Sequence, residues 1–263
     1  MSADQPRSPA PVATTTDFTG KLAVVTGAAN GIGRASAIHF ARHGADVVVI
    51  DLQEEALDGT AEEIRKLGKS AHPMLVDCSK HEAIVDAFAR IDKDVGTVEI
   101  LLNNVGQSAR ERASEFWCSE PEVWNFIINL NLMSMMSCCR QVVPGMRERG
   151  RGKIVSIASE AAYMGSQGVA DYAAAKAGVI GLTRSLAREL APFQVNVNAV
   201  CPGPIRTAAA DKLPIWETYL KETPMAFAGD PQDIANAVIF FASDQSRYVT
   251  GQSLIVNGGR WWS

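Results

Sequence analysis

The twelve residues LAVVTGAANGIG, numbers 22–33, carry the strongest indication of fold in the chain. The first five are mostly apolar and predict a buried strand, and a helical pattern begins at the far end of the segment. Between them, Gly27, Gly31 and Gly33 have the spacing G-x-x-x-G-x-G instead of the more familiar G-x-G-x-x-G. Strand, glycine-rich turn and helix together place backbone N–H groups and a helix N-terminus where a pyrophosphate can bind. Glycine-rich turns also occur without a ligand, so the segment predicts a nucleotide site only in combination with others.

Short apolar runs alternate with amphipathic stretches along the rest of the chain. This rhythm predicts an α/β fold, a single-domain Rossmann-type doubly wound parallel sheet of about seven strands with helices on both faces. Gly68 is expected to end the second helix, Ser79 to cap the third and Asp230 to cap the last. The expected strands are residues 22–26, 45–50, 71–76, 98–102, 153–157, 194–200 and 254–256, and the expected helices are residues 32–43, 54–67, 79–94, 121–148, 171–190 and 231–242.

Composition and charge narrow the class of protein. The 263 residues carry a net charge of −4, which predicts no nucleic-acid partner and no anionic membrane surface. No apolar run approaches the roughly 18 residues of a membrane span. The five cysteines, among them the adjacent Cys138 and Cys139, form no disulfide framework and predict a reducing cytoplasm.

Domain organisation is simple. Residues 1–16 are rich in Pro, Ala, Ser and Thr and lack the apolar segment of a signal peptide, so we expect a disordered lead-in. Residues 17–263 are expected to form one domain, with a mobile flap at about residues 204–228, where periodicity is mixed.

We expect no metal site, because His39 and His43 have the spacing of a zinc pair but lack an obvious third ligand.

Polar and glycine residues gather at the carboxyl ends of the predicted strands. Gly27, Asp51, Asp77 and Asn103 each follow one strand, and ligands of such sheets bind at these ends. Asp51 lies where a carboxylate can hydrogen-bond the ribose hydroxyls of an adenosine and repel a 2′-phosphate. The neighbouring Asn30 supplies no cation for that phosphate. These observations predict NAD in preference to NADP, although Asp51 could also be a turn residue.

A second group of residues suggests proton chemistry. Tyr172 and Lys176 lie four apart and therefore share one face of a helix, and Ser159 precedes Tyr172 by thirteen residues. An ammonium beside a tyrosine favours the phenolate, so we expect the pKa of Tyr172 to be lowered. The pair is weak evidence alone, because most such pairs lie on exposed helix surfaces.

Together these motifs resemble the short-chain dehydrogenase/reductase family, in its shorter form, over residues 18–259. The segment 26–33 resembles the cofactor loop of that family, and Asn103–Gly106 resembles its N-N-A-G motif with Val105 in place of alanine. The resemblance implies four catalytic residues, Asn131, Ser159, Tyr172 and Lys176. It also implies that the cofactor is bound by Gly27, Asn30, Gly31, Ile32, Gly33, Asp51, Leu52, Asp77, Cys78, Asn104, Val105, Gly106, Tyr172, Lys176, Pro202, Gly203, Ile205 and Thr207.

The implied reaction is NAD-dependent interconversion of a secondary alcohol and a ketone by hydride transfer. Tyr172 would be the general acid/base, Lys176 would lower its pKa and bind the nicotinamide ribose, and Ser159 would hold the substrate oxygen. Asn131 would position a water behind Lys176. The resemblance further implies a homotetramer, to which the apolar helix around Met135 and Met136 and the terminal Trp261 and Trp262 would contribute.

Three loops are expected to form the substrate pocket, at residues 107–116, 160–167 and after Thr207. Their apolar side chains suggest a cyclic, aromatic or otherwise apolar substrate, oxidised in the favoured direction. A hydroxyacyl thioester and a dihydrodiol stay open as substrates, as does binding of an anion by Arg110 or Arg112, for which surface arginine is the alternative. One alternative function is a 3-oxoacyl-thioester reductase, and one of a different class is a non-catalytic NAD-binding sensor or scaffold. The pocket residues singled out are Arg110, Arg112, Phe116, Tyr163, Met164, Trp216 and Tyr219.

Overall fold

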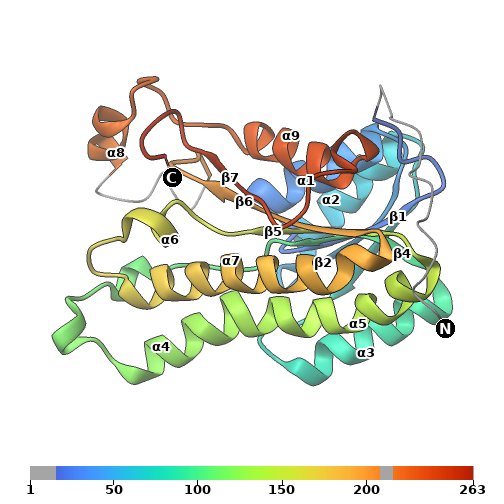
Figure 1. Ribbon diagram of the computed structural model, residues 1–263, viewed down its shortest axis with the longest axis horizontal. Helices are drawn as coiled ribbons and strands as arrows, with labels where there is room; N and C mark the ends of the chain where they lie inside the picture. Colours follow the sequence, from blue (N-terminus) through green and yellow to red (C-terminus); the bar gives the residue numbers. More distant parts are fainter. Residues whose placement is uncertain (1–15, 208–215, 263) are drawn as a thin grey trace.

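The computed structural model describes residues 16–207 and 216–262, and its centre is a seven-stranded sheet. The strands follow the order β3-β2-β1-β4-β5-β6-β7, and every neighbouring pair is parallel (Figure 1). This confirms the predicted doubly wound sheet. Its strands are β1 (Leu22–Thr26), β2 (Asp46–Asp51), β3 (Ala71–Leu75), β4 (Val98–Asn103), β5 (Gly152–Ile157), β6 (Val195–Pro202) and β7 (Ser253–Val256).

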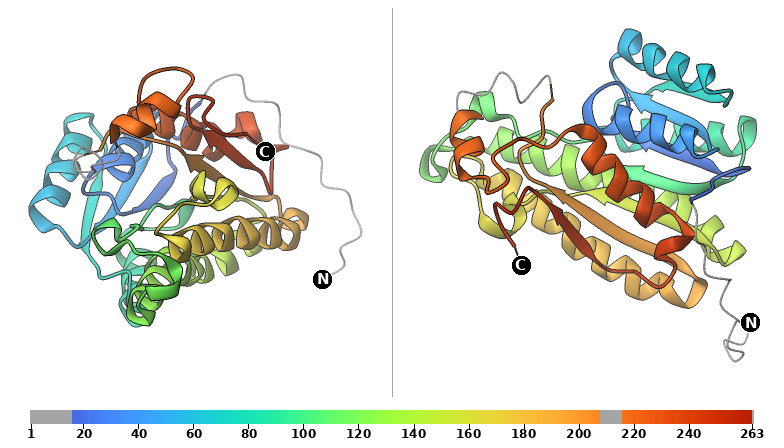
Figure 2. Two further views of the ribbon diagram at one scale, coloured as in Figure 1. Left: turned by 90° about the vertical axis from the view of Figure 1, so that its left-hand side faces the viewer. Right: turned by 90° about the horizontal axis from the view of Figure 1, so that it is seen from above.

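Helices cover both faces of the sheet, as Figure 2 shows from two sides. The first layer consists of α1 (Gly31–Arg42), α2 (Glu54–Lys66) and α9 (Pro231–Ala242), and the second of α3 (His81–Asp94), α5 (Ser134–Arg149) and α7 (Ala170–Leu190). Successive residues of β1 point to opposite faces, so that Val24 and Val25 join different apolar clusters. Burial on both faces explains why the strands are continuous apolar runs.

Local polar contacts fix the helix ends. Gly68, at φ 77°, lies just beyond the end of α2, and the Asp230 side chain caps α9 in a capping box with Asp233, both as predicted. The prediction that Ser79 caps the third helix is wrong, because α3 begins at His81 after Lys80. The Asp77 carboxylate accepts hydrogen bonds from the backbone N–H and the hydroxyl of Ser79 at 3.0 and 2.6 Å, so Ser79 belongs to the turn that precedes the helix.

The predicted long helix is interrupted. Residues Asn129–Met133 form a π-helical turn, η3, between α4 (Pro121–Ile128) and α5. By length and composition, the continuous helical stretch Pro121–Arg149 is long and apolar enough to cross a membrane. This finding differs from our expectation that no part of the chain approaches a membrane span. The side chains of Met135, Cys138 and Met146 in this stretch belong to the buried cluster beneath the sheet, so we assign the stretch to the core of this fold.

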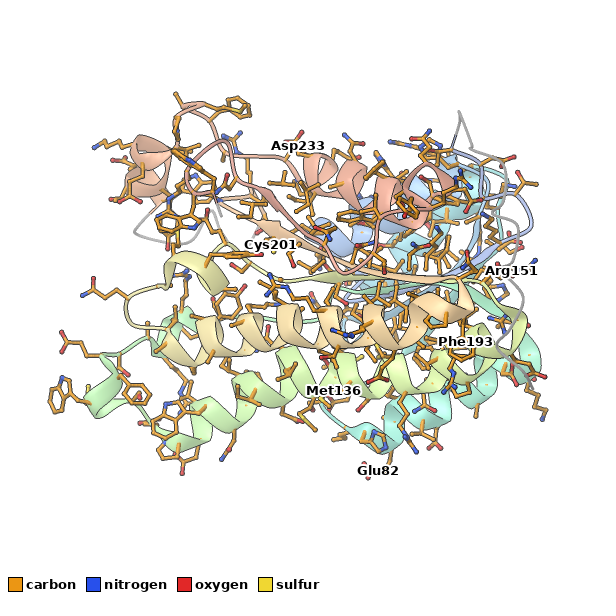
Figure 3. The ribbon with its side chains drawn as sticks, in the orientation of Figure 1. Glu82, Met136, Arg151, Phe193, Cys201 and Asp233 are labelled. Atoms are coloured by element: carbon orange, nitrogen blue, oxygen red, sulfur yellow. The ribbon has the colours of Figure 1, made fainter. Side chains whose placement is uncertain are left out.

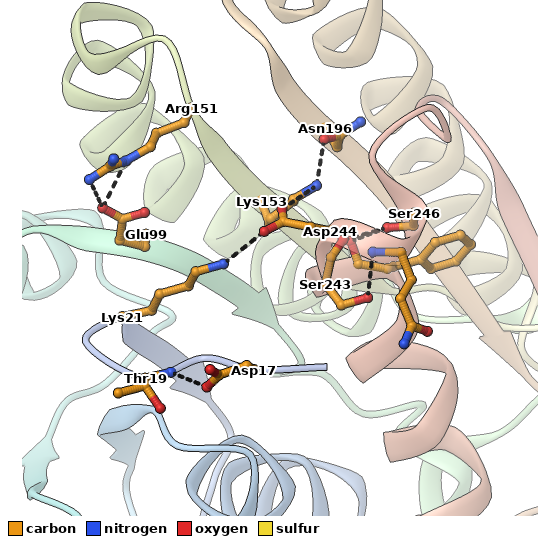
Figure 4. A network of polar contacts seen from close by, with 12 residues as sticks. Asp17, Thr19, Lys21, Glu99, Arg151, Lys153, Asn196, Ser243, Asp244 and Ser246 are labelled. Carbon is orange, nitrogen blue, oxygen red and sulfur yellow. Dashed lines mark hydrogen bonds and ion pairs between the residues drawn. The ribbon is translucent and has the colours of Figure 1, made fainter. Parts of the chain in front are cut away.

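Ion pairs join the amino ends of the strands, opposite the ends where the glycine-rich turn lies (Figure 4). Asp244, in the turn η6 (Asp244–Ser246), pairs with Lys21 at 3.2 Å and with Lys153 at 3.7 Å. Burial lowers the pKa of Lys153, whose ammonium also donates to Asn196 at 2.8 Å. These ion pairs and the hydrogen bond therefore stabilise the edge of the sheet that lies opposite the glycine-rich turn.

Two predicted segments fall partly outside the described residues. The lead-in at 1–16 lies outside them except for Thr16, and residues 208–215 of the expected flap do so as well. The rest of the flap contains a helix that we did not predict, α8 (Trp216–Glu222). It lies at the same end of the molecule as the short helix α6 (Ala161–Met164), on the left in Figure 1.

Candidate active site

A cleft of about 1210 Å³ opens at the carboxyl ends of the strands. It extends from the glycine-rich turn to the amino-terminal turns of α7, and its walls come from the loops that follow strands β1 to β6. Most predicted site residues line it: Gly27, Asn30, Gly31, Ile32, Asp51, Leu52, Cys78, Asn104, Val105, Gly106, Ser159, Tyr172, Lys176, Pro202, Gly203, Ile205 and Thr207. Gly33, Asp77 and Asn131 are not among the lining residues.

The glycine-rich turn needs its glycines for space and for backbone conformation. Gly27 and Gly31 have φ angles of 66° and 54°, in the left-handed region that other residues rarely adopt. A Cβ at Gly33 would lie 2.0 Å from the Gly27 carbonyl oxygen. The Asn104 amide locks the turn by donating to the carbonyls of Thr26 and Gly27 at 3.1 and 3.0 Å. The start of α1 is thereby held open toward the cleft, where an anion can bind.

Asp51 lies at the end of the cleft next to that turn. Its carboxylate accepts backbone hydrogen bonds from Ala29 at 3.0 Å, Leu52 at 2.7 Å and Gln53 at 3.1 Å. Three donors fix the carboxylate in place and leave part of its acceptor capacity unused. Asp77, by contrast, accepts hydrogen bonds from Ser79 and pairs with Lys80 at 3.4 Å. The hydrogen bond from the Ser79 hydroxyl, aided by Lys80, lowers the pKa of Asp77.

Tyr172 and Lys176 face the cleft from the first two turns of α7, with the Lys176 ammonium 5.7 Å from the centre of the tyrosine ring. The ammonium donates to the Ile157 carbonyl at 2.8 Å, and burial lowers the pKa of Lys176 to about 8. Burial also raises the pKa of Tyr172, against the opposing effects of the Ser159 hydroxyl and the Arg110 charge. The expected lowering of the Tyr172 pKa is therefore wrong for this structure, since removal from water outweighs nearby positive charge.

Asn131 lies just behind this pair, on the π-helical turn. Its amide nitrogen donates to the carbonyls of Gln107 and Ile127, both at 2.9 Å, while its side-chain oxygen is buried and has no hydrogen-bond partner among the described residues. A Cβ at Gly106 would lie 2.3 Å from that oxygen and 3.1 Å from the Lys176 ammonium. Asn131 also borders a cavity of about 10 Å³, the room that about one water needs.

The buried thiols near the cleft are poor nucleophiles. Burial raises the pKa of Cys78 and of Cys201, each to about 12. Cys201 lies on β6 just before the turn that leaves the sheet (Figure 3). The thiolate is the reactive form of cysteine, so these two thiols are not suited to act as nucleophiles at neutral pH.

Comparisons with known proteins all indicate the same family for this chain. Residues 27–260 match the family model described as enoyl-(acyl carrier protein) reductase. The 3-oxoacyl-[acyl-carrier-protein] reductase FabG of Thermotoga maritima is 37% identical over 242 residues, which cover 91% of this chain and 97% of that protein. The (2S)-[(R)-hydroxy(phenyl)methyl]succinyl-CoA dehydrogenase subunit BbsD of Thauera aromatica is 39% identical over 249 residues, which cover 91% and 96%. The chain belongs to the short-chain dehydrogenase/reductase family. As a member it is an oxidoreductase acting on hydroxyl and keto groups.

Solved structures of short-chain dehydrogenases agree with this assignment. A 7α-hydroxysteroid dehydrogenase in complex with NADH and 7-oxo glycochenodeoxycholic acid superposes with a TM-score of 0.88 at 34% identity, covering 93% of this chain and 95% of its own. A crystal structure described as a putative gluconate dehydrogenase from Agrobacterium tumefaciens has a TM-score of 0.89 at 32% identity and covers 93% and 97%.

The substrate end of this short-chain dehydrogenase/reductase is built by α6, α8 and the C-terminal segment. Arg260 bridges Glu160, next to Ser159, and Glu222 on α8, and its guanidinium lies 4.5 Å from the Tyr219 ring centre. We did not predict Arg260 as a site residue. Its two partners lie 100 and 38 residues away in the sequence, so no local sequence pattern predicts these ion pairs.

Several predicted pocket residues do line the cleft and others do not. Arg110, Met164, Trp216 and Tyr219 are among the lining residues. Phe116 is not, because its ring stacks on Trp124 at 5.4 Å, away from the cleft. Tyr163 packs against the buried cluster beneath the sheet, and Arg112 pairs with Glu120 outside the cleft.

Proposed function

We propose that this protein oxidises a secondary alcohol to a ketone with NAD, on a cyclic, aromatic or otherwise apolar substrate. The observation that carries the proposal is the convergence of Ser159, Tyr172 and Lys176 on one cleft with the glycine-rich turn and Asp51. Met164, Trp216 and Tyr219 supply apolar surface at the substrate end.

A dinucleotide suits the residues of the cleft. The glycine-rich turn leaves room that a Cβ would fill, and the start of α1 offers backbone N–H groups to a pyrophosphate. The partly unused carboxylate of Asp51 suits the ribose hydroxyls at one end, and Lys176 suits the nicotinamide ribose at the other. Bound there, the oxidised dinucleotide supplies a hydride acceptor and a positive charge.

In the proposed reaction, Tyr172 takes the hydroxyl proton of the alcohol. Because burial raises the pKa of Tyr172, positive charge beside it is needed for the phenolate to form near neutral pH. The Lys176 ammonium supplies part of that charge, and the Ser159 hydroxyl donates a hydrogen bond to the substrate oxygen. The unpartnered oxygen of Asn131 can hold a water behind Lys176, through which the proton reaches solvent.

The preference for NAD rests on charge. The Asp51 carboxylate faces the adenosine end of the cleft, where its negative charge disfavours a 2′-phosphate. The other described side chains that line this end, Asn30, Leu52 and Gln53, carry no positive charge.

A second candidate is reduction of a 3-oxoacyl thioester. It is favoured by the similarity to FabG reductases, whose names state that activity. The similarity to BbsD instead supports oxidation of a hydroxyacyl-CoA. Assay of both thioester types with NAD(H) and NADP(H) separates these possibilities, since a clear NADPH preference favours the reductase.

Replacing Tyr172 by phenylalanine tests the mechanism. We expect Tyr172→Phe to lower turnover by about 100-fold or more, the usual range for loss of a general acid/base, while NADH binding stays within about twofold. Turnover is followed by nicotinamide absorbance over a panel of secondary alcohols, and binding by NADH fluorescence. Tyr163→Phe is the matched control, because Tyr163 lies nearby but outside the cleft. Substantial turnover in Tyr172→Phe would contradict the acid/base role of Tyr172. If the protein were instead a non-catalytic sensor or scaffold, the wild type would show no turnover.

We further propose that the protein is a cytoplasmic homotetramer. All five cysteines are free thiols, and four of them are buried, which suits a reducing compartment. Cell fractionation tests the location, and the assembly is argued below.

A further inference from the structure

Arg110 is held at the substrate end of the cleft by an unusual backbone. The preceding residue, Ala109, is buried and has φ 45° and ψ 44°, in the left-handed region that costs a non-glycine residue free energy. Arg110 then begins a single 3-10 turn, η1 (Arg110–Arg112). This turn places Arg110 on the wall of the cleft that also contains Tyr172, while Arg112 lies outside it.

The contacts of Arg110 leave its charge unneutralised. One guanidinium nitrogen lies 3.4 Å from the Ser166 hydroxyl oxygen, and the guanidinium carbon lies 5.7 Å from the Tyr219 ring centre. No salt bridge joins Arg110 to any carboxylate within residues 16–207 and 216–262.

The two neighbouring arginines differ from it. Arg260 is bound by both Glu160 and Glu222, and Arg112 is bound by Glu120. Arg110 is also close enough to the reacting end to oppose the rise in the pKa of Tyr172. A planar cation with free donors, beside the proposed proton acceptor, matches an anion on the substrate.

We propose that Arg110 binds an anionic group of the substrate, a carboxylate or a phosphate, and thereby orients the alcohol carbon toward Tyr172. This rests on the proposed alcohol oxidation and adds a substrate class, namely secondary alcohols that carry an acid group or a phosphate-bearing carrier. The guanidinium can bind either group through two parallel hydrogen bonds. Ser166, which also lines the cleft, supplies a hydroxyl next to the same group.

Two pairs of matched substrates test this inference and separate the sources of the anion. The first pair is 3-hydroxy-3-phenylpropanoate and its methyl ester, which differ in the carboxylate. The second pair is the coenzyme A and N-acetylcysteamine thioesters of the same acid, which differ in the phosphates. We expect one charged member to exceed its neutral partner in kcat/KM by about tenfold to a hundredfold, the usual effect of a charged hydrogen bond.

Variants at Arg110 then assign the preference. Arg110→Gln should bring the charged-to-neutral ratio close to one, and Arg110→Lys should keep part of it, because lysine retains charge but not the two-pronged geometry. Arg112→Gln is the matched control and should leave the ratio unchanged. Using ratios cancels any effect of Arg110 on the pKa of Tyr172, since both substrates of a pair meet the same tyrosine.

The outcomes are distinct. A wild-type ratio near one in both pairs, or a ratio that Arg110→Gln leaves intact, would overturn the inference while leaving the proposed function standing. If neither these four compounds nor the panel of secondary alcohols is turned over with NAD or NADP, the proposed function fails. The inference is then judged by calorimetry, as the ratio of dissociation constants of the same four compounds in wild type and Arg110→Gln. Thermal unfolding of each variant identifies any that fail to fold.

Discussion

At the scale of single residues, burial rather than charge dominates the protonation of the cleft. Removal from water lowers the pKa of Lys176 to about 8 and raises that of Tyr172. The two pKa values move in opposite directions because burial disfavours the charged form of each group, the phenolate of Tyr172 and the ammonium of Lys176. The pair therefore favours a neutral tyrosine near pH 7, and a phenolate requires positive charge to be brought in.

Asp51 allows the cofactor preference to be tested. Replacing it with alanine removes the negative charge at the adenosine end of the cleft and the two carboxylate oxygens that accept three hydrogen bonds from backbone N–H groups. We expect Asp51→Ala to lower the ratio of kcat/KM for NAD to that for NADP by about tenfold to a hundredfold, the usual range for a charged hydrogen bond. Steady-state kinetics with both dinucleotides measure this ratio.

The matched control lies at the other end of the same strand. Asp46 accepts the Ser70 N–H at 2.8 Å, so Asp46→Ala also loses a carboxylate that bonds the backbone, but far from the cleft. It should leave the NAD/NADP ratio unchanged. If Asp51→Ala also leaves it unchanged, the cofactor preference depends on another residue.

At the scale of elements, the π-helical turn between α4 and α5 determines where Asn131 points. A π turn inserts an extra residue into the helical spacing, and such turns are frequent at functional sites. Asn131 bonds two carbonyls through its nitrogen, so its oxygen is directed toward the space above Gly106, next to the Lys176 ammonium. Three elements, the loop after β4, η3 and α7, thus meet at one point.

This meeting point leaves no room for a side chain at Gly106. In Gly106→Ala the new methyl group would lie 2.3 Å from the Asn131 oxygen, so that side chain must shift. We expect turnover to fall by about tenfold or more, the lower part of the range for disturbed proton transfer, and the melting temperature to drop. Gly59→Ala, on the exposed face of α2 with nothing within 4 Å, is the control. It should keep full activity and gain about 0.5–1 kcal/mol of stability from helix propensity. Full activity of Gly106→Ala would contradict the role given to Asn131.

The elements also show what the sequence could predict. All seven strands lie within one or two residues of their expected positions, because both-face burial makes each one an apolar run. The π turn was missed because its residues continue a helical pattern, and α8 because its short segment has no clear period. Arg260 was missed because its role depends on Glu160 and Glu222, which only the folded chain brings near.

At the scale of the whole molecule, two apolar surfaces lie apart from the cleft. The first is on α4, η3 and α5, where Phe126, Met133 and Met136 are 39%, 45% and 43% exposed. Met136 is labelled in Figure 3. The second is at the edge strand β7, where Leu254 is 41% exposed, and in the C-terminal segment that follows it, where Trp262 is 75% exposed. We propose that these side chains contact other copies of the chain, since exposed apolar patches commonly mark such contacts. In the proposed tetramer each of the two surfaces pairs with its own copy on another chain, which generates a pair of dimers.

Light scattering at micromolar concentration tests this assembly. We expect the wild type to have four times the 28.2 kDa chain mass. Met136→Glu places a charge on the first surface only, so it should halve the mass to that of a dimer held by the β7 surface, and Trp262→Glu should do the same through the second. Leu75→Glu is the control, because Leu75 is 56% exposed but lies on β3, the opposite edge strand of the sheet. A monomeric wild type would contradict the tetramer. If Met136→Glu alone gave monomers, only one of the two surfaces would be an interface, because a chain with two independent interfaces must keep one when the other is lost.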